Sequence, residues 1–514
     1  MMTTRPTTRP TSRTAAGRLT ALGAAVAIAL AGCAPATGDA AGSATASPAV
    51  ATGEPGTFFD ASTVHEIAID VDDAALTTML QTYLDSGDKE WITASVTIDG
   101  ETYDGVGIKL KGNSTLRGVT VDTPAQDLPW RIRLDKFTDD SDVDGYTDLV
   151  VRASSSETSL NEAVALDLLE AAGLASERAV ATRFSVNGSE EVVRLTLQNL
   201  DDTWTQENFA DGSADAGSVL YKAEAGGDYS WRGEDGAAYA EAFEIEAGAD
   251  DYAPLVELLD LANNASDADF AAQLPELLDV QQLARYLAFE DLIGNFDDIS
   301  GPGNNSYLYW DAATEEFTVV AWDHNLAFGV ANVGGGGGVT DGGGMPGAAG
   351  ARAGGVPPGA GERPTDLPDG EAPVLPDGGL PDGGLPDGGM DGGRGGMTRS
   401  NPLVDRFLAD DDLAALVDEA AADLQAELVD SGLLEDVVAT WSSVLTDGAS
   451  DLVPADVVTA EGDAITSFEP GSATGPGGGG PVAGGGRPGA GSGEQPAVPN
   501  REDEDGDAAA SATT

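Results

Sequence analysis

Residues 295–323 have the sequence NFDDISGPGNNSYLYWDAATEEFTVVAWD, and they decide the fold class of this chain. Two runs rich in aromatic and β-branched residues, 306–310 and 317–322, predict a pair of strands around a short turn. The preceding segment, 252–296, has apolar residues at helical spacing, and helical periodicity returns over 403–445. A hairpin placed among helices, after an earlier part rich in strands, predicts an α+β protein with two lobes.

The earlier part of the chain contains most of the predicted strands. Several short runs alternate apolar and polar residues, which is typical of strands with one buried face. The pair Asn187-Gly188 marks a hairpin between two such runs. One segment instead has its apolar residues on a helical stripe and stops at Gly173. The predicted strands are 64–71, 94–100, 106–110, 130–134, 184–188 and 192–197, and the predicted helix is 160–172.

The composition excludes several classes of protein. The 514 residues include 88 Asp and Glu but only 25 Lys and Arg, for a formal net charge of −63. A protein without a basic excess cannot bind nucleic acid by neutralising phosphates, nor dock on an anionic membrane through a basic patch. The single cysteine excludes a disulfide framework and a multi-cysteine metal site. The acidic excess itself fits either a solvated surface or the binding of divalent cations.

The first 33 residues predict a secretory signal. Four arginines precede an apolar run, 19–31, which is too short to span a bilayer as a permanent helix. The run ends in Leu30-Ala31-Gly32-Cys33, which resembles the bacterial lipobox. Lipids attached to Cys33 would then anchor the protein at the outer face of the cell membrane.

Composition divides the rest of the chain into folded and disordered parts. Residues 333–400 consist largely of Gly, Pro and Asp, with three copies of Leu-Pro-Asp-Gly-Gly, and cannot bury enough apolar surface to become ordered. The expected organisation is a signal peptide at 1–33, a disordered tether at 34–57, a domain at 58–332, a disordered insertion at 333–400, the helices that complete the domain at 401–468, and a disordered acidic tail at 469–514.

Three segments contain residues suited to phosphoryl transfer. Lys111-Gly112-Asn113-Ser114 follows a predicted strand, and its backbone could approach phosphates, although a surface turn has the same composition. Asp297 and Asp298, followed by Asn304 and Asn305, offer an acid for an attacking hydroxyl and an amide for a divalent metal; the alternative is a polar loop that caps helices and turns. Asp323, at the end of a strand, is placed like the metal-binding acid of a kinase.

A fourth segment resembles the opening of a calcium loop. Asp140, Asp142 and Asp144 alternate and are followed by Gly145. The twelfth position is Val151, where an EF-hand needs a bidentate glutamate, so this is not an EF-hand. The remaining alternatives are a looser Ca²⁺ loop and an ordinary acidic turn.

Taken in order, these segments resemble the spore-coat CotH kinase family. The resemblance implies a divergent, two-lobed protein-kinase-like fold and ATP-dependent phosphorylation of Ser or Thr on a protein substrate, assisted by Mg²⁺ or Mn²⁺. It covers most of the expected domain but neither the insertion nor the tail. It rests on Lys111-Gly112-Asn113-Ser114, Pro129 to Leu134, Ser159-Leu160-Asn161-Glu162, Leu220-Tyr221-Lys222, Asn295-Phe296-Asp297, Asn304 to Tyr309, and Trp322-Asp323.

The resemblance also implies roles for particular residues. Asp297 would be the catalytic acid, with Asp298 as the alternative, and Asn305 (or Asn304) and Asp323 would hold the metal. Arg133 would take the place of a phosphate-pairing lysine, and Glu162 would orient it from its helix. The Lys111–Ser114 segment would lie near the phosphates. A non-catalytic surface scaffold, stabilised by calcium, and a metal-dependent phosphoesterase are the alternatives.

Overall fold

The computed structural model describes six stretches of the chain. The expected signal peptide with Cys33, nearly all of the expected tether and tail, the insertion at 333–400, and Asn304 lie outside them. The described residues are 56–153, 156–209, 217–224, 227–300, 305–330 and 401–470.

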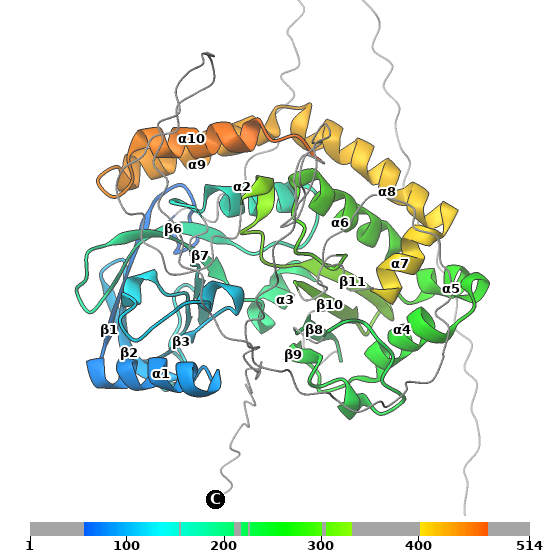
Figure 1. The fold of residues 1–514 in the computed structure, drawn as a ribbon, viewed down its shortest axis with the longest axis horizontal. Helices are drawn as coiled ribbons and strands as arrows, with labels where there is room; N and C mark the ends of the chain where they lie inside the picture. The colour runs from blue at the N-terminus through cyan, green and yellow to red at the C-terminus, as the bar shows by residue number, and fades with distance from the viewer. Residues whose placement is uncertain are drawn as a thin grey trace, which may run out of the picture. The chain divides into compact units, whose positions relative to one another are not determined.

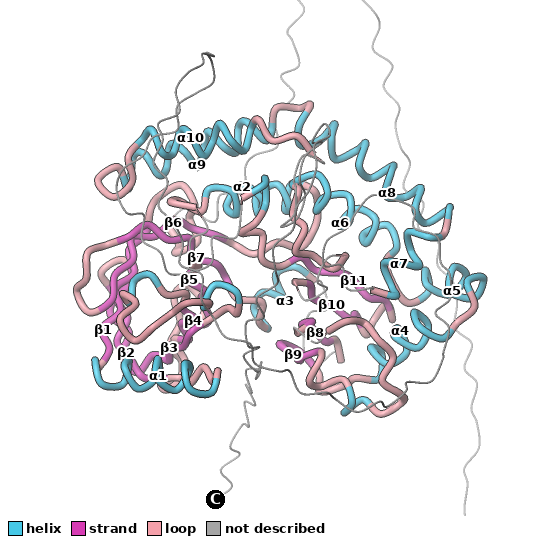
Figure 2. The backbone as a smooth tube through the Cα atoms, in the orientation of Figure 1, coloured by secondary structure: helices cyan, strands magenta, loops and turns pink. Residues whose placement is uncertain are grey.

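Seven strands close into a barrel (Figures 1 and 2). The strands follow the order β1-β2-β3-β4-β5-β7-β6, and the parallel pairing of β1 with β6 closes the ring, while all other neighbours are antiparallel. Alternation along β1 places Ile67 and Ile69 in the core, as expected for a strand with one buried face. The strands are β1 His65–Val71, β2 Ile92–Ile98, β3 Glu101–Leu110, β4 Trp130–Arg133, β5 Asp148–Val151, β6 Ala179–Val186 and β7 Val192–Gln198.

Helix α2 (Leu160–Ala171) connects β5 with β6 and is buried along most of its length. The C-terminal helices α9 (Leu433–Ala449) and α10 (Ala455–Thr466) pack against it, as Figure 1 shows. The indole Nε1 of Trp441 on α9 donates a hydrogen bond of 2.8 Å to Asp167 Oδ2 on α2. Helix α1 (Asp73–Ser86) follows β1 and contacts β2.

A second sheet has four antiparallel strands in the order β11-β10-β8-β9. Helix α6 packs against β11 and α8. The strands are β8 Val219–Ala223, β9 Phe243–Gly248, β10 Ser306–Asp311 and β11 Glu316–Ala321; the helices are α3 Asp202–Asn208, α4 Ala253–Asn264, α5 Asp267–Gln273, α6 Val280–Ile293, α7 Pro402–Ala409 and α8 Asp411–Leu424. Single turns of 3₁₀-helix lie at Ser114–Leu116, Ala125–Asp127, Gly236–Ala238, Leu274–Glu276 and Ala327–Gly329, and a π-helix lies at Gln425–Val429.

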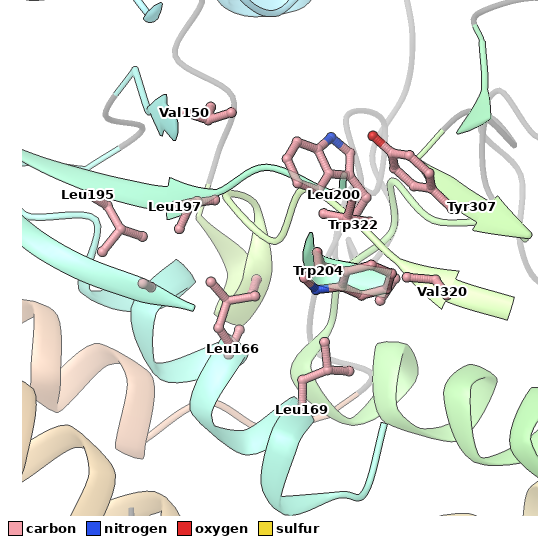
Figure 3. Close-up of a cluster of buried hydrophobic side chains, with 14 of the residues drawn as sticks. Val150, Leu166, Leu169, Leu195, Leu197, Leu200, Trp204, Tyr307, Val320 and Trp322 are labelled. Atoms are coloured by element: carbon pink, nitrogen blue, oxygen red, sulfur yellow. The ribbon is translucent and has the colours of Figure 1, made fainter. Parts of the chain in front are cut away.

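A common hydrophobic core joins the barrel to the second sheet (Figure 3). Figure 3 shows Leu195 and Leu197 of β7, Leu166 and Leu169 of α2, and Val320 of β11 within one buried cluster. Burial of such side chains is the main favourable term in folding. The two sheets are therefore held by shared packing rather than by strand pairing.

The mixed α+β composition predicted from the sequence is confirmed, and so are the hairpin that became β10 and β11 and the helix that became α2. The closure of the earlier strands into a barrel was not predicted. No helix in the described stretches combines the length and apolarity needed to cross a membrane.

Candidate phosphoryl-transfer site

The β10–β11 hairpin brings Asp297, Asn305 and Asp323 together. Ser306 pairs with Ala321 at one end of the hairpin. Asn305 directly precedes Ser306, and Asp323 comes two residues after Ala321, so both lie at that end. Asp297 lies in the loop that connects α6 to β10, and its carboxylate accepts a hydrogen bond from the Asn305 side chain. Burial, together with the nearby charge of Asp323, raises the pKa of Asp297 to about 6. Three of the residues selected from sequence thus lie in one cluster.

The backbone at Asp323 is held in an unusual conformation. Its φ of 69° lies in the left-handed region, which residues with a Cβ seldom adopt, although Asp is among those found there. The Asp323 carboxylate accepts a hydrogen bond from the Arg152 guanidinium. Strained backbone of this kind persists only where the surrounding structure fixes it, and it is concentrated at functional sites.

Arg152, Glu162 and Asp323 form a largely buried ionic cluster. Arg152 directly follows the last residue of β5, and Glu162 lies in the first turn of α2. Two bonds join them, from Arg152 Nε to Glu162 Oε2 at 3.0 Å and from Arg152 Nη2 to Glu162 Oε1 at 2.9 Å. Burial opposes the charge of Arg152, but Asp323 and Glu162 outweigh it and hold its pKa above the usual value.

This cluster corrects the partner expected for Glu162. The sequence suggested Arg133, but the Arg133 side chain instead pairs with Asp135 at 2.9 Å, with about 30% of each side chain exposed. Arg133 ends β4, whereas the arginine that reaches α2 is Arg152, which follows β5. Glu162 does pair with a cation, but the cation is Arg152, which follows β5, and not Arg133 of β4.

Lys111 lies in a cavity beside this cluster. Its Nζ sits 5.6 Å from the centroid of the Trp322 ring, and it lines the cavity with Gly112, Thr115 and Asp323, among others. Burial, reinforced by the charges of Lys222 and Arg131, lowers the pKa of Lys111 to about 7.

The loop after Lys111 has two features suited to a ligand. Gly112 has a φ of 90°, and a Cβ there would lie 2.3 Å from Thr115 Oγ1, so only glycine fits. The Thr115 hydroxyl is buried and has no hydrogen-bond partner among the described residues. Asn113 Oδ1 accepts a bond of 3.0 Å from Lys89. The backbone of Ser114 begins a short 3₁₀ turn.

Asp298, the alternative to Asp297 as the catalytic acid, has its carboxylate bound within its own loop. Asp298 is buried and accepts bonds from the backbone N–H of Ser300 at 2.9 Å and from its hydroxyl at 2.8 Å. Its carboxylate therefore stabilises its own loop.

The expected calcium segment forms a turn around Val143 and Tyr146. Asp142 accepts from Gly145 N, and Asp144 accepts from Phe58 N, each at 2.7 Å. In the part of the chain that the structure describes, no three His, Cys, Asp or Glu side chains gather as a metal-binding group. The carboxylates of Asp142 and Asp144 therefore hold backbone groups of this region, and a calcium site at Asp140, Asp142 and Asp144 stays a prediction.

The sequence did not predict the buried contacts of His324 and Glu290, which connect the two segments of the site. His324 is fully buried, and its Nε2 lies 3.1 Å from Glu290 Oε1, while Glu290 Oε2 accepts from Asn295 at 2.8 Å. Burial alone would lower the pKa of His324, but Glu290 and other acids raise it to about 9. The contacts of Glu290 with His324 and Asn295 thus tie the Asp323 segment to the segment that leads to Asp297.

The cluster brings together an acid, an amide, a second acid near a strand end, and a helix glutamate paired with a cation, which are residue types that protein-kinase-type phosphoryl-transfer centres use. A family model described as CotH kinase protein matches residues 108–450, well over half of the chain. The chain therefore belongs to the CotH kinase family. No curated protein matches it.

Proposed function

We propose that this chain is an atypical protein kinase that transfers the γ-phosphate of ATP to Ser or Thr hydroxyls of envelope or secreted proteins. One observation carries the proposal: the cluster of Asp297, Asn305 and Asp323 beside the cavity lined by Lys111 and Arg152. In this proposal, the barrel and the second sheet correspond to the two lobes of a divergent kinase.

Asp297 would accept the proton of the attacking hydroxyl. Its pKa of about 6 leaves the carboxylate ionised near neutral pH, yet more basic than an exposed aspartate. Asn305 holds this carboxylate through its side chain and thereby orients it.

The donors at the site fit a hard divalent cation. The carboxylate of Asp323 and the amide oxygen of Asn305 are the kind of ligand that Mg²⁺ and Mn²⁺ prefer. When bound there, such an ion would neutralise charge on the transferred phosphate. The orphaned Thr115 hydroxyl and the Gly112 backbone would contact the phosphates, with Lys111 supplying positive charge.

The cellular location remains part of the proposal. Residues 1–33 would be a lipoprotein signal, Cys33 would hold the lipid, and residues 34–57 would be the tether, which places the kinase domain at the outer face of the cell membrane. The strong negative charge agrees with a soluble domain that does not bind the membrane surface itself.

The buried position of Lys111 predicts a pH-dependent affinity for ATP. With a pKa of about 7 in the free protein, its ammonium is lost as pH rises above that value, whereas bound phosphates would favour the charged form. The affinity should be highest below about pH 7 and should fall as the pH rises from about 7 into the alkaline range. Calorimetry over this range measures the effect. Lys111→Met should bind more weakly, with a flatter profile; an equally flat wild-type profile would contradict the role.

Phosphate transfer itself is tested with γ-labelled ATP. The purified chain without its first 33 residues, supplied with Mg²⁺ or Mn²⁺, should label Ser or Thr in envelope proteins, and Asp323→Ala should not. Release of inorganic phosphate without protein labelling would indicate a phosphoesterase. Thermal stabilisation by Ca²⁺ but not by Mg·ATP would indicate a scaffold.

A further inference from the structure

Helix α10 lies beyond the residues that the family model matches. The family match ends at residue 450, whereas α10 spans Ala455–Thr466 and is followed by Phe468. Figure 1 shows α10 beside α9 and along α2. Its contacts nonetheless lead directly to the proposed site.

Glu461 on α10 binds the segment that leads into α2. Its carboxylate accepts hydrogen bonds from Glu157 N at 2.8 Å, from Ser156 Oγ at 3.3 Å and from the hydroxyl of Thr158. The same Thr158 hydroxyl accepts a bond of 3.1 Å from the N–H of Leu160, the first residue of α2. A carboxylate on one helix therefore fixes the start of another.

The start of α2 depends on this support. Its N-cap, Ser159, has a φ of 57° and makes no side-chain capping bond. A helix begins with unpaired N–H groups, and a side chain at the N-cap usually satisfies one of them. Thr158 supplies that bond here, and Glu461 holds Thr158. Glu162 follows within the same turn and carries the bonds to Arg152.

Phe468 reaches the other half of the site. Its ring lies edge-on to Phe328, with centroids 5.8 Å apart, and Phe328 follows Asp323 after a short loop. It also covers Gly294, the C-cap of α6, where a Cβ would lie 2.3 Å from Phe468 Cζ. Asp297 is three residues further along. One short segment therefore contacts elements on both sides of the cluster.

We propose that residues 455–468 are a positioning element of the enzyme. Glu461 sets the start of α2, and through it the Glu162–Arg152–Asp323 cluster, while Phe468 holds the segments that carry Asp297 and Asp323. Neither residue lines the cavity beside the cluster, so both act as positioning residues, and this inference rests on the proposed kinase function. Misplacement of reacting groups by about 1 Å lowers rates about a hundredfold, so small shifts transmitted through α2 would be visible in kcat.

The test compares Glu461→Gln with Asp463→Asn in the full chain. Both changes remove one negative charge from α10, but Asp463 is exposed and its carboxylate makes no bond to the α2 segment. E461Q should lower kcat for protein phosphorylation about tenfold or more, with little change in the KM for ATP. D463N should leave both constants near wild type.

Hydrogen exchange provides a readout that does not need activity. E461Q should speed amide exchange in the first turn of α2, and D463N should not. Phe468→Ala should lower kcat, and Phe468→Leu should restore most of it, since the apolar contact with Gly294 and Phe328 returns. Equal amide exchange rates in the first turn of α2 for E461Q and D463N would overturn this inference. An inactive wild-type protein would overturn the proposed function instead, and the exchange measurement would still be informative.

Discussion

Replacing Asp297 with asparagine should lower the rate of phosphate transfer by at least about a hundredfold while leaving ATP affinity nearly unchanged. The substitution keeps the size of the side chain but removes the group that would accept the hydroxyl proton. Asn305 and Asp323, which would hold the metal, remain in place, so nucleotide should still bind. Initial rates with labelled ATP and calorimetric titration with Mg·ATP measure the two quantities separately.

Asp298→Asn is the matched control for this substitution. The Asp298 carboxylate is engaged by Ser300 within its own loop, so its loss should act on stability more than on the chemical step. The assignment of Asp297 would be contradicted by a D297N protein that transfers phosphate at a wild-type rate, or by a D298N protein that is folded, binds ATP and has lost transfer.

Arg152→Met should destabilise the protein by about 3–5 kcal/mol and remove activity. The substitution leaves Glu162, which is almost fully buried, and its neighbour Asp323 without their cation. Burial already raises the pKa of Glu162 although Arg152 opposes this, so removing Arg152 should raise it further. Urea unfolding measures the change in free energy, and labelling measures the activity.

Arg133→Met is the control, because the Arg133 guanidinium pairs with the partly exposed Asp135 and not with Glu162 or Asp323 of the buried cluster. Its effect on stability should remain below about 1 kcal/mol. Equal losses in the two variants would contradict the assignment of Arg152 as the partner of Glu162. Full activity in a folded R152M protein would contradict its place in the site.

The sequence was informative where structure is local. The strands of the β10–β11 hairpin and helix α2 have patterns complete within about a dozen residues, and both were predicted. Strand β5 was missed because its four residues, Asp148–Val151, are all buried and show no alternation. The parallel pairing of β1 with β6 joins residues more than a hundred positions apart, and no local pattern encodes it.

The site likewise contains residues that a local pattern reveals and residues that only long-range packing brings together. Asp297, Asn305 and Asp323 were found together because one loop and one hairpin carry all three. The sequence analysis named only Arg133 as the partner of Glu162, and finding Arg152 instead required the three-dimensional packing of β5 beside α2. Glu461 is about 300 residues from the segment it binds, and only the packing of α10 on α2 reveals it.

A crystal structure of the chain with Mn²⁺ and a non-hydrolysable ATP analogue tests the proposed centre most directly. We expect anomalous density for Mn²⁺ within roughly 2.0–2.3 Å of oxygens of Asp323 and Asn305, with the terminal phosphate facing Asp297 and Lys111 beside the phosphates. Nucleotide bound away from this cavity, or metal held by other residues, would contradict the assignment of this site.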